Sequence, residues 1–79
     1  MNERIKILVC SDTEYEQLIA EIYIDGKFIA LLSQENGADD LQLEFPDRAQ
    51  NFAIISRKVD CSLLRISIEA AQTQLVGGV

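Results

Sequence analysis

The residue pair Asp25-Gly26 constrains the fold of this chain more than any other feature of its sequence. It separates two runs rich in β-branched and other apolar residues, residues 18–24 and 27–33. Asp-Gly between such runs is typical of a type I′ turn, in which both central residues adopt positive φ and the flanking strands pair antiparallel. The sequence therefore predicts a tight β-hairpin whose two-residue loop fixes the strand pairing.

The alternation of apolar and polar residues with period two extends on both sides of this hairpin. It is present in residues 5–9 and, after a second turn signal at Asn36-Gly37, in residues 41–45. Residues 52–59 are typical of a further strand, with Arg57-Lys58 marking an exposed edge. Because successive side chains of a strand point to opposite faces, the pattern predicts a meander of four or five strands.

The last element has a different period. Its apolar residues recur at the spacing of an amphipathic helix: Leu64, Ile68, Ala71 and Leu75. Asp60 is placed to cap the start of this helix, and Gly77 is placed to end it in a left-handed conformation. The predicted fold class is therefore α+β. We expect a single domain over residues 1–79, an antiparallel β-meander followed by one C-terminal helix packed on one face of the sheet.

Both faces of the predicted hairpin are apolar, so the core has to be assigned to one of them. A simple two-residue loop pairs Ile22 with Ile29 and Ala20 with Leu31. With the next strand added, one face carries the better core candidates: Ile19, Tyr23, Phe28, Leu32, Leu41, Leu43 and Phe45. A bulge in residues 34–40 would reverse this assignment, because a slip of one residue moves every side chain to the other face.

The second face is too apolar to be left in water, because large exposed apolar patches usually mark interfaces. It would carry six side chains: Leu18, Ala20, Ile22, Ile24, Ile29 and Leu31. Either the first strand and the loops fold across this face, or a second copy of the chain covers it. We expect a homodimer that uses these six residues as its interface.

The charge balance narrows the class of partner. Seven Lys and Arg residues against thirteen Asp and Glu give a net charge of −6, whereas a nucleic-acid-binding protein normally presents a basic face. Two acidic segments stand out: Asp12, Glu14 and Glu16 in one, and Glu35, Asp39 and Asp40 in the other. Their spacing does not match a calcium loop, so we interpret them as solvated loops that would steer a basic protein toward the chain.

Candidates for catalysis are few. The chain contains no histidine, which excludes the catalytic triads and every zinc site that needs imidazole. Cys10 and Cys61 belong to no C-x-x-C pair and are expected to be separate thiols. The alternative to a binding module is a small enzyme or ligand-binding protein that uses Glu21, a carboxylate among apolar neighbours, or Cys61, at the start of the helix, in a cleft. We expect no metal and no cofactor.

Export and membrane segments are not indicated. The apolar run after Arg4 and Lys6 spans only residues 7–10 and is followed at once by acidic residues, whereas a signal sequence needs about 7–15 apolar residues. No apolar stretch approaches the roughly 18 residues of a membrane span. We expect a cytoplasmic location.

One resemblance adds to these expectations. Residues 18–37, together with Phe45-Pro46 and the Arg57-Lys58-Val59-Asp60 segment that leads into the final helix, resemble small acidic bacterial proteins of compact build. Immunity proteins of bacterial toxin systems are among such proteins. The resemblance implies a non-enzymatic module that acts by protein–protein contact and assigns no functional residue.

Overall fold

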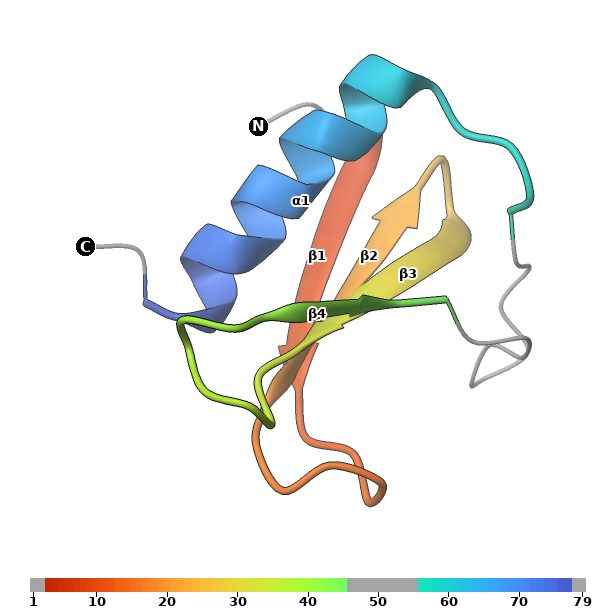
Figure 1. Cartoon of the computed structure of the whole chain (residues 1–79). Coiled ribbons are helices and arrows are strands. Elements are labelled where there is room, and N and C mark those ends of the chain that lie inside the picture. The colour runs from red at the N-terminus through yellow and green to blue at the C-terminus, as the bar shows by residue number, and fades with distance from the viewer. Residues whose placement is uncertain (1–2, 46–55, 78–79) are drawn as a thin grey trace.

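The structure is a computed structural model that describes residues 3–45 and 56–77. Its elements are, in order, the strands β1 (Ile5–Cys10), β2 (Ile19–Ile24), β3 (Lys27–Ser33) and β4 (Gln42–Glu44), and the helix α1 (Cys61–Leu75). The four strands form one antiparallel sheet in the order β1-β2-β3-β4, and α1 packs on one of its faces (Figure 1). The predicted α+β meander with a C-terminal helix is confirmed.

The predicted strand over residues 52–59 is not confirmed. Residues 52–55 lie outside the described part of the chain, and residues 56–59 belong to no strand, although the Ser56 amide donates a hydrogen bond of 3.0 Å to the Phe28 carbonyl of β3. No helix in the described residues has both the length and the apolar character that crossing a bilayer requires.

The hairpin turn has the conformation that its sequence predicts. Asp25 has φ 54° and Gly26 has φ 78°, so both central residues are left-handed, as a type I′ turn demands. Ile24 pairs with Lys27, and Tyr23 pairs with Phe28, in the expected register. Arg4 reinforces the turn, since its carbonyl accepts a hydrogen bond of 2.8 Å from the Asp25 amide.

Beyond Tyr23 the expected register is wrong. Ile22 pairs with Ala30, and Ala20 pairs with Leu32, so Ile29 is an extra residue in β3 without a partner in β2. This bulge shifts the rest of β3 by one residue relative to β2. The sequence analysis considered a reversing bulge only in residues 34–40, whereas the irregularity lies inside the hairpin itself.

The bulge changes which residues of β3 share a face with Ala20, Ile22 and Ile24 of β2. The face of β2 that was predicted to be open lies beneath the helix, and its side chains form the main core with those of α1. The buried members of this core are Ile5, Ala20, Ile22, Ile24, Ile29, Ala30, Leu32, Leu63, Ala71 and Leu75. The predicted core assignment is therefore wrong for Ile19, Tyr23 and Phe28, which lie on the opposite face, and for Phe45, which is exposed. It holds for Leu32, Leu41 and Leu43.

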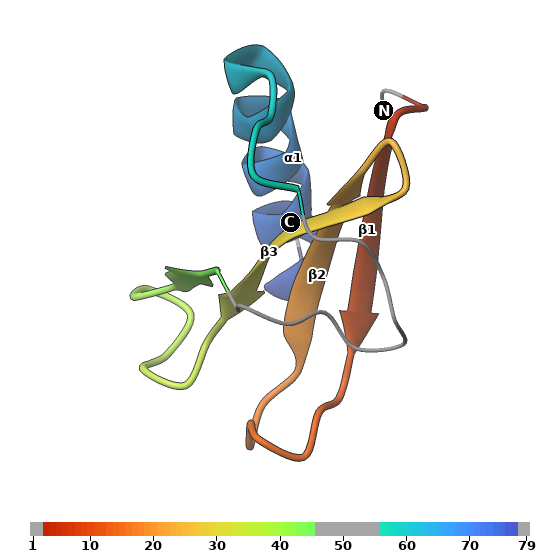
Figure 2. The same cartoon turned by 90° about the vertical axis from the view of Figure 1, so that its right-hand side faces the viewer.

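The opposite face carries a smaller cluster. Ile19, Phe28 and Leu31 are buried there, and Cys10, Tyr15 and Tyr23 pack against them. Tyr15 comes from the connection between β1 and β2, so part of this loop folds across the face. Figure 2 shows the resulting two layers, with α1 on one side of the sheet.

Helix α1 begins and ends where the sequence predicts. The Asp60 carboxylate accepts a hydrogen bond of 3.0 Å from the Leu63 amide, which satisfies one of the free donors of the first turn. Gly77 follows the helix with φ 79°. The buried line of the helix is Leu63, Ser67, Ala71 and Leu75, whereas Leu64 and Ile68 are half-buried at its side.

Candidate functional site

Two loops at one end of the sheet carry the acidic segments noted in the sequence. The β1–β2 loop (residues 11–18) and the β3–β4 loop (residues 34–41) both lie at the end opposite the Asp25-Gly26 turn (Figures 1 and 2). Neither loop contains a Lys or Arg residue. We call the six carboxylates of these loops the acidic end: Asp12, Glu14, Glu16, Glu35, Asp39 and Asp40.

Glu35 fastens the two loops together. Its carboxylate accepts hydrogen bonds of 2.7 Å from the Glu16 amide and 2.9 Å from the Gln17 amide. Gln34 adds a third link, because its side-chain amide donates to the Leu18 carbonyl at 3.0 Å. The two bonds to the Glu35 carboxylate are charge-assisted, and such bonds are stronger than neutral ones. The structure thus joins two segments that the sequence analysis treated separately into one surface.

The two loops combine the exposed charge of the acidic end with one large exposed apolar side chain, Leu18. Five of the six carboxylate residues are exposed, and Asp12 is half-buried and accepts a hydrogen bond of 2.9 Å from the Glu14 amide. Leu18, in the same loop, is 48% exposed. Within the described residues no group of three or more His, Cys, Asp or Glu side chains is arranged to hold a metal ion. The surface can therefore attract cations by charge and offer an apolar contact beside them.

A tyrosine ties the β1–β2 loop to β4. The Tyr15 hydroxyl donates to Glu44 Oε1 at 2.8 Å, across the face opposite α1. Burial, together with this hydrogen bond to the carboxylate, raises the pKa of Tyr15 to about 12 from its ordinary value of 10.0. The link fixes the acidic loop against the edge of the sheet.

This link predicts a loss of stability at alkaline pH. The folded chain holds the Tyr15 proton more tightly than the unfolded chain, so the stabilisation is complete below pH 10.0 and is lost as the pH rises through about 12. Urea unfolding of the wild type at increasing pH is expected to show this loss. Tyr15→Phe is expected to show less of it. If tyrosinate absorbance shows both tyrosines titrating at the ordinary value, the link does not form in solution.

Glu21, one of the two alternative catalytic residues, is a buried carboxylate on the face opposite α1. It is 8% exposed and accepts a hydrogen bond of 3.2 Å from the Tyr23 hydroxyl. Burial and the nearby Glu21 carboxylate raise the pKa of the Cys10 thiol. Tyr23 and Cys10 thus interact with the Glu21 carboxylate, and a thiol with a raised pKa is a poor nucleophile.

Cys61, the other alternative, is exposed in the first turn of α1. Arg65 lies one turn further along, with its guanidinium 3.9 Å from the sulfur. Both Cys10 and Cys61 are free thiols, as expected. Because α1 packs on the face opposite the one that carries Glu21, the structure does not bring Glu21 and Cys61 into a common site.

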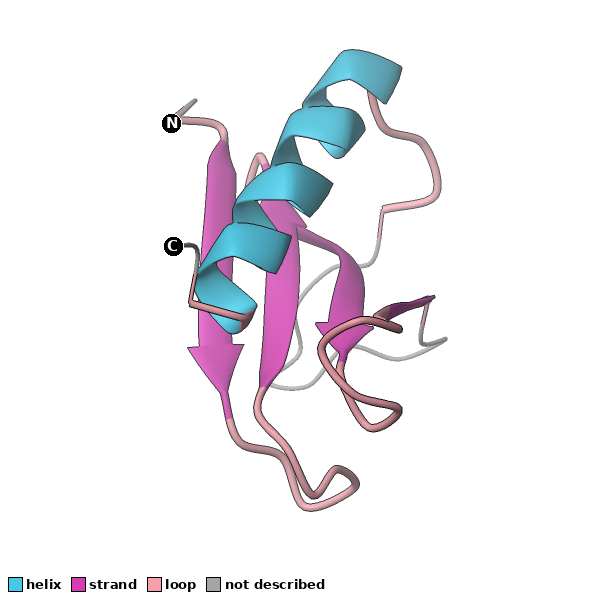
Figure 3. Ribbon diagram, turned by 60° about the vertical axis from the view of Figure 1, so that its left-hand side comes forward, coloured by secondary structure: helices cyan, strands magenta, loops and turns pink. Residues whose placement is uncertain are grey.

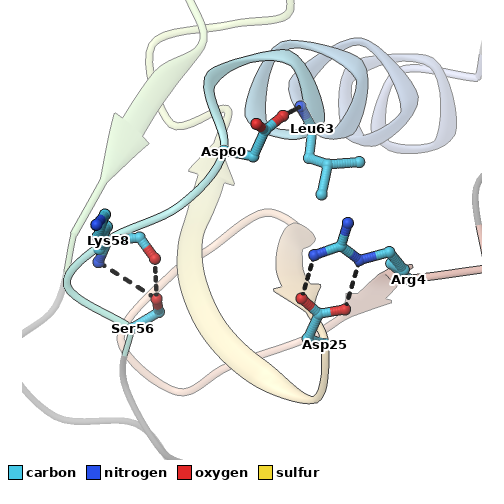
Figure 4. Close-up of polar contacts among 6 residues, drawn as sticks. All are labelled: Arg4, Asp25, Ser56, Lys58, Asp60 and Leu63. Carbon is cyan, nitrogen blue, oxygen red and sulfur yellow. Dashed lines mark hydrogen bonds and ion pairs between the residues drawn. The ribbon is translucent and has the colours of Figure 1, made fainter.

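A small cavity lies near the hairpin turn and the start of α1, and its polar contacts are drawn in Figure 4. Its volume is about 130 Å³, and cationic side chains at its wall come from Arg4, Lys27 and Lys58. The Arg4 guanidinium donates to both oxygens of Asp25, at 2.8 and 2.7 Å, and this pairing lowers the pKa of the Asp25 carboxyl. The Asp60 carboxylate is engaged as the helix cap. The Arg4 contacts join the start of β1 to the hairpin turn.

The six residues of the predicted homodimer interface are separated in the structure. Ala20, Ile22, Ile24 and Ile29 lie beneath α1, Leu31 belongs to the cluster on the opposite face, and Leu18 is exposed at the acidic end. The prediction of an uncovered apolar face is wrong, because the helix of the same chain covers most of it. Self-association therefore stays a prediction, but this face is not available as its interface. Sedimentation velocity at micromolar concentration tests whether the chain self-associates.

A groove between α1 and β4 was not predicted from the sequence. Its volume is about 320 Å³, and its apolar wall is formed by Leu32, Leu41, Leu43 and Ile68. The alternation in residues 41–45 was a signal that Leu41 and Leu43 share a face. What the sequence did not reveal is that α1 leaves this part of the face incompletely covered.

Comparison of the chain with known proteins found no matching family model, no similar curated protein and no similar solved structure.

Proposed function

We propose that the chain is a non-enzymatic protein-binding module whose acidic end engages a basic partner protein. The observation that supports this proposal is the pair of hydrogen bonds from the Glu16 and Gln17 amides to Glu35, which unites both acidic loops into one surface. Six carboxylates without a Lys or Arg residue in either loop create a local field that attracts positive charge. An inhibitor or immunity-type protein in the cytoplasm is the most concrete form of such a module.

In this proposal, charged and apolar side chains act at different steps of binding. Exposed carboxylates steer an oppositely charged partner and raise the association rate, while buried apolar contacts hold the complex after encounter. Leu18, 48% exposed beside the acidic end, is suited to the second step. The fastening of the loops by Glu35 supports a preformed surface, which reduces the ordering cost of binding.

The alternative, a small enzyme or ligand-binding protein using Glu21 or Cys61, has less support. Neither residue lines the cavity near the hairpin turn or the groove beside β4. Glu21 is buried, and Cys61 has no histidine to act as its general base, while the adjacent Asp60 carboxylate caps the helix. No observation favours this alternative over the binding module.

We expect neutralisation of the acidic end to slow binding without weakening the fold. The test variant is Glu14→Gln/Glu16→Gln, and the matched control, Glu3→Gln/Glu69→Gln, removes the same charge from exposed positions outside both loops. Basic proteins retained by the immobilised chain at low salt are identified and purified, and their association is followed by stopped-flow fluorescence. The test variant is expected to associate about tenfold more slowly at low ionic strength.

Two comparisons make this result specific. The difference in association rate should disappear at high salt, where long-range attraction is screened. The free energy of unfolding measured in urea should be nearly unchanged, because exposed carboxylates contribute little to stability. Equal association rates for the test variant, the control and the wild type at low salt would contradict the proposal.

A further inference from the structure

The groove beside β4 exists because α1 does not extend across the whole sheet. The helix packs on β1 and β2 and, to a lesser extent, on β3, but its backbone does not come close to that of β4. Figure 3 shows the helix in front of the first strands, with β4 beyond its edge. The helix wall of the groove is formed by Ile68 and Gln72, and the sheet wall includes Leu41 and Leu43. A groove of about 320 Å³ therefore lies beside the last strand, and Asp39 and Gln72 add polar groups to its apolar lining.

The last strand also has a free edge in the described part of the chain. β4 pairs with β3 on one side, and no described strand pairs with it on the other. Its side chains alternate between the two faces: Leu43 packs with the core beneath α1, whereas Glu44 accepts the Tyr15 hydrogen bond on the opposite face. An edge of this kind offers backbone donors and acceptors to an added strand, and alternate side chains of that strand would fall into the groove.

Charge restricts what would occupy this edge. The chain has no Lys or Arg residue between Lys27 and Arg48, and that stretch includes β3 after its first residue, the β3–β4 loop and β4. Asp39 lines the groove itself, and Glu44 lies on β4. A second copy of the chain, with its net charge of −6, would bring like charges together along this edge. A cationic segment is complementary to it.

We propose that an extended segment of a basic partner protein, with alternating apolar and cationic side chains, adds to β4 as a fifth strand and inserts its apolar side chains into the groove. This inference rests on the proposed function, since it assigns the binding mode of the same basic partner. The acidic end, which includes Asp39 and Asp40 in the β3–β4 loop, adjoins one end of the groove. Steering by the loops and strand addition at β4 are then successive parts of one binding event.

The test uses the full chain and a synthetic peptide as a probe. The peptide is Lys-Val-Lys-Val-Lys-Val-Lys with blocked ends, and its control has the same composition in the order Lys-Lys-Val-Val-Val-Lys-Lys, which breaks the alternation. Backbone amide shifts of the isotope-labelled chain are followed by NMR during titration. We expect the largest shifts at β4 and at Ile68 and Gln72, and at least severalfold weaker binding of the control peptide.

A pair of helix variants tests the groove directly. Gln72→Arg places a positive charge at the groove wall, and Gln74→Arg places the same charge in the same turn, about 200° further around the helix axis. Both residues are exposed, so neither substitution removes a core contact. Gln72→Arg is expected to weaken peptide binding about tenfold, and Gln74→Arg to change it little, in line with the penalty for like charges at a contact.

The outcomes separate this inference from the proposed function. Shifts confined to the two acidic loops, insensitive to Gln72→Arg and reduced in Glu14→Gln/Glu16→Gln, would overturn strand addition and leave the acidic end as the binding surface. Shifts at β4 that respond to Gln72→Arg but not to Glu14→Gln/Glu16→Gln would support the groove and contradict steering by the loops. No shift at any residue would overturn the inference, while the partner association rates would still decide the proposed function.

Discussion

Ile22→Asp is expected to unfold the chain. Ile22 is fully buried between the sheet and α1, so the substitution removes its apolar contacts and places an unpaired carboxylate in the core. Truncation of a buried isoleucine to alanine alone costs about 2–5 kcal/mol. The buried charge adds to that cost. A domain of this length has a total stability of about 4–12 kcal/mol, so the combined loss should remove cooperative unfolding as observed by circular dichroism.

The matched control for this experiment is Ile66→Asp. It makes the same chemical change on α1 at a side chain that is 44% exposed, where we expect a loss of no more than about 1 kcal/mol. The two variants also distinguish the structure from the dimer interface predicted for Ile22. If Ile22→Asp stays folded and only dissociates a dimer, Ile22 faces a second copy rather than the helix of its own chain.

Ser67→Leu is expected to destabilise the chain by about 1–3 kcal/mol, the usual cost of overfilling a packed core. Ser67 is fully buried on the line of α1 that faces the sheet, and its hydroxyl donates to the Leu64 carbonyl at 2.7 Å. Its small volume is matched on the sheet by Ala20 and Ala30, which are also fully buried. A larger side chain at position 67 would therefore need space that this packed layer does not offer.

Two controls identify size as the cause. Ser67→Ala removes the hydroxyl but keeps the small volume. Because the hydroxyl donates only to a carbonyl of its own helix, that of Leu64, the free energy of unfolding measured in urea should change little. Ser62→Leu makes the large substitution at an exposed position of the same helix. If Ser67→Leu is as stable as the wild type, the contact between α1 and the sheet is looser than the structure describes.

The elements of this fold were predictable where their signals are local. The Asp25-Gly26 turn could be read from two residues, because the type I′ conformation depends on the φ angles of those residues alone. The start of α1 was predictable for the same reason, since Asp60 caps the helix through an amide only three residues away.

The assignment of the sheet faces failed because the bulge at Ile29 has no local signal. Residues 28–32, Phe-Ile-Ala-Leu-Leu, are apolar at every position, so an extra residue does not disturb any alternation in the sequence. Packing decides the register here: the bulge places both Ile29 and Ala30 in the core beneath α1. Tertiary packing of this kind cannot be derived from period-two patterns.

One part of the candidate site, its charge, could be predicted from the sequence, whereas the arrangement of its loops could not. The acidic loops stand out in the sequence by charge alone, but their union depends on Glu35 reaching the Glu16 and Gln17 amides across the end of the sheet. Glu35 was predicted as one exposed charge among six, whereas its carboxylate is a structural connector between loops.

The position of α1 at the end of the described chain has a consequence for synthesis. The ribosome produces β1 to β4 first, and the face that carries Ala20, Ile22 and Ile24 has no cover until residues 61–75 have emerged. During that interval the nascent sheet exposes a continuous apolar surface, the kind of surface that aggregates or recruits chaperones. Ribosome-bound chains stopped before Cys61 should therefore bind a chaperone that recognises nascent chains, and emergence of the helix should displace it.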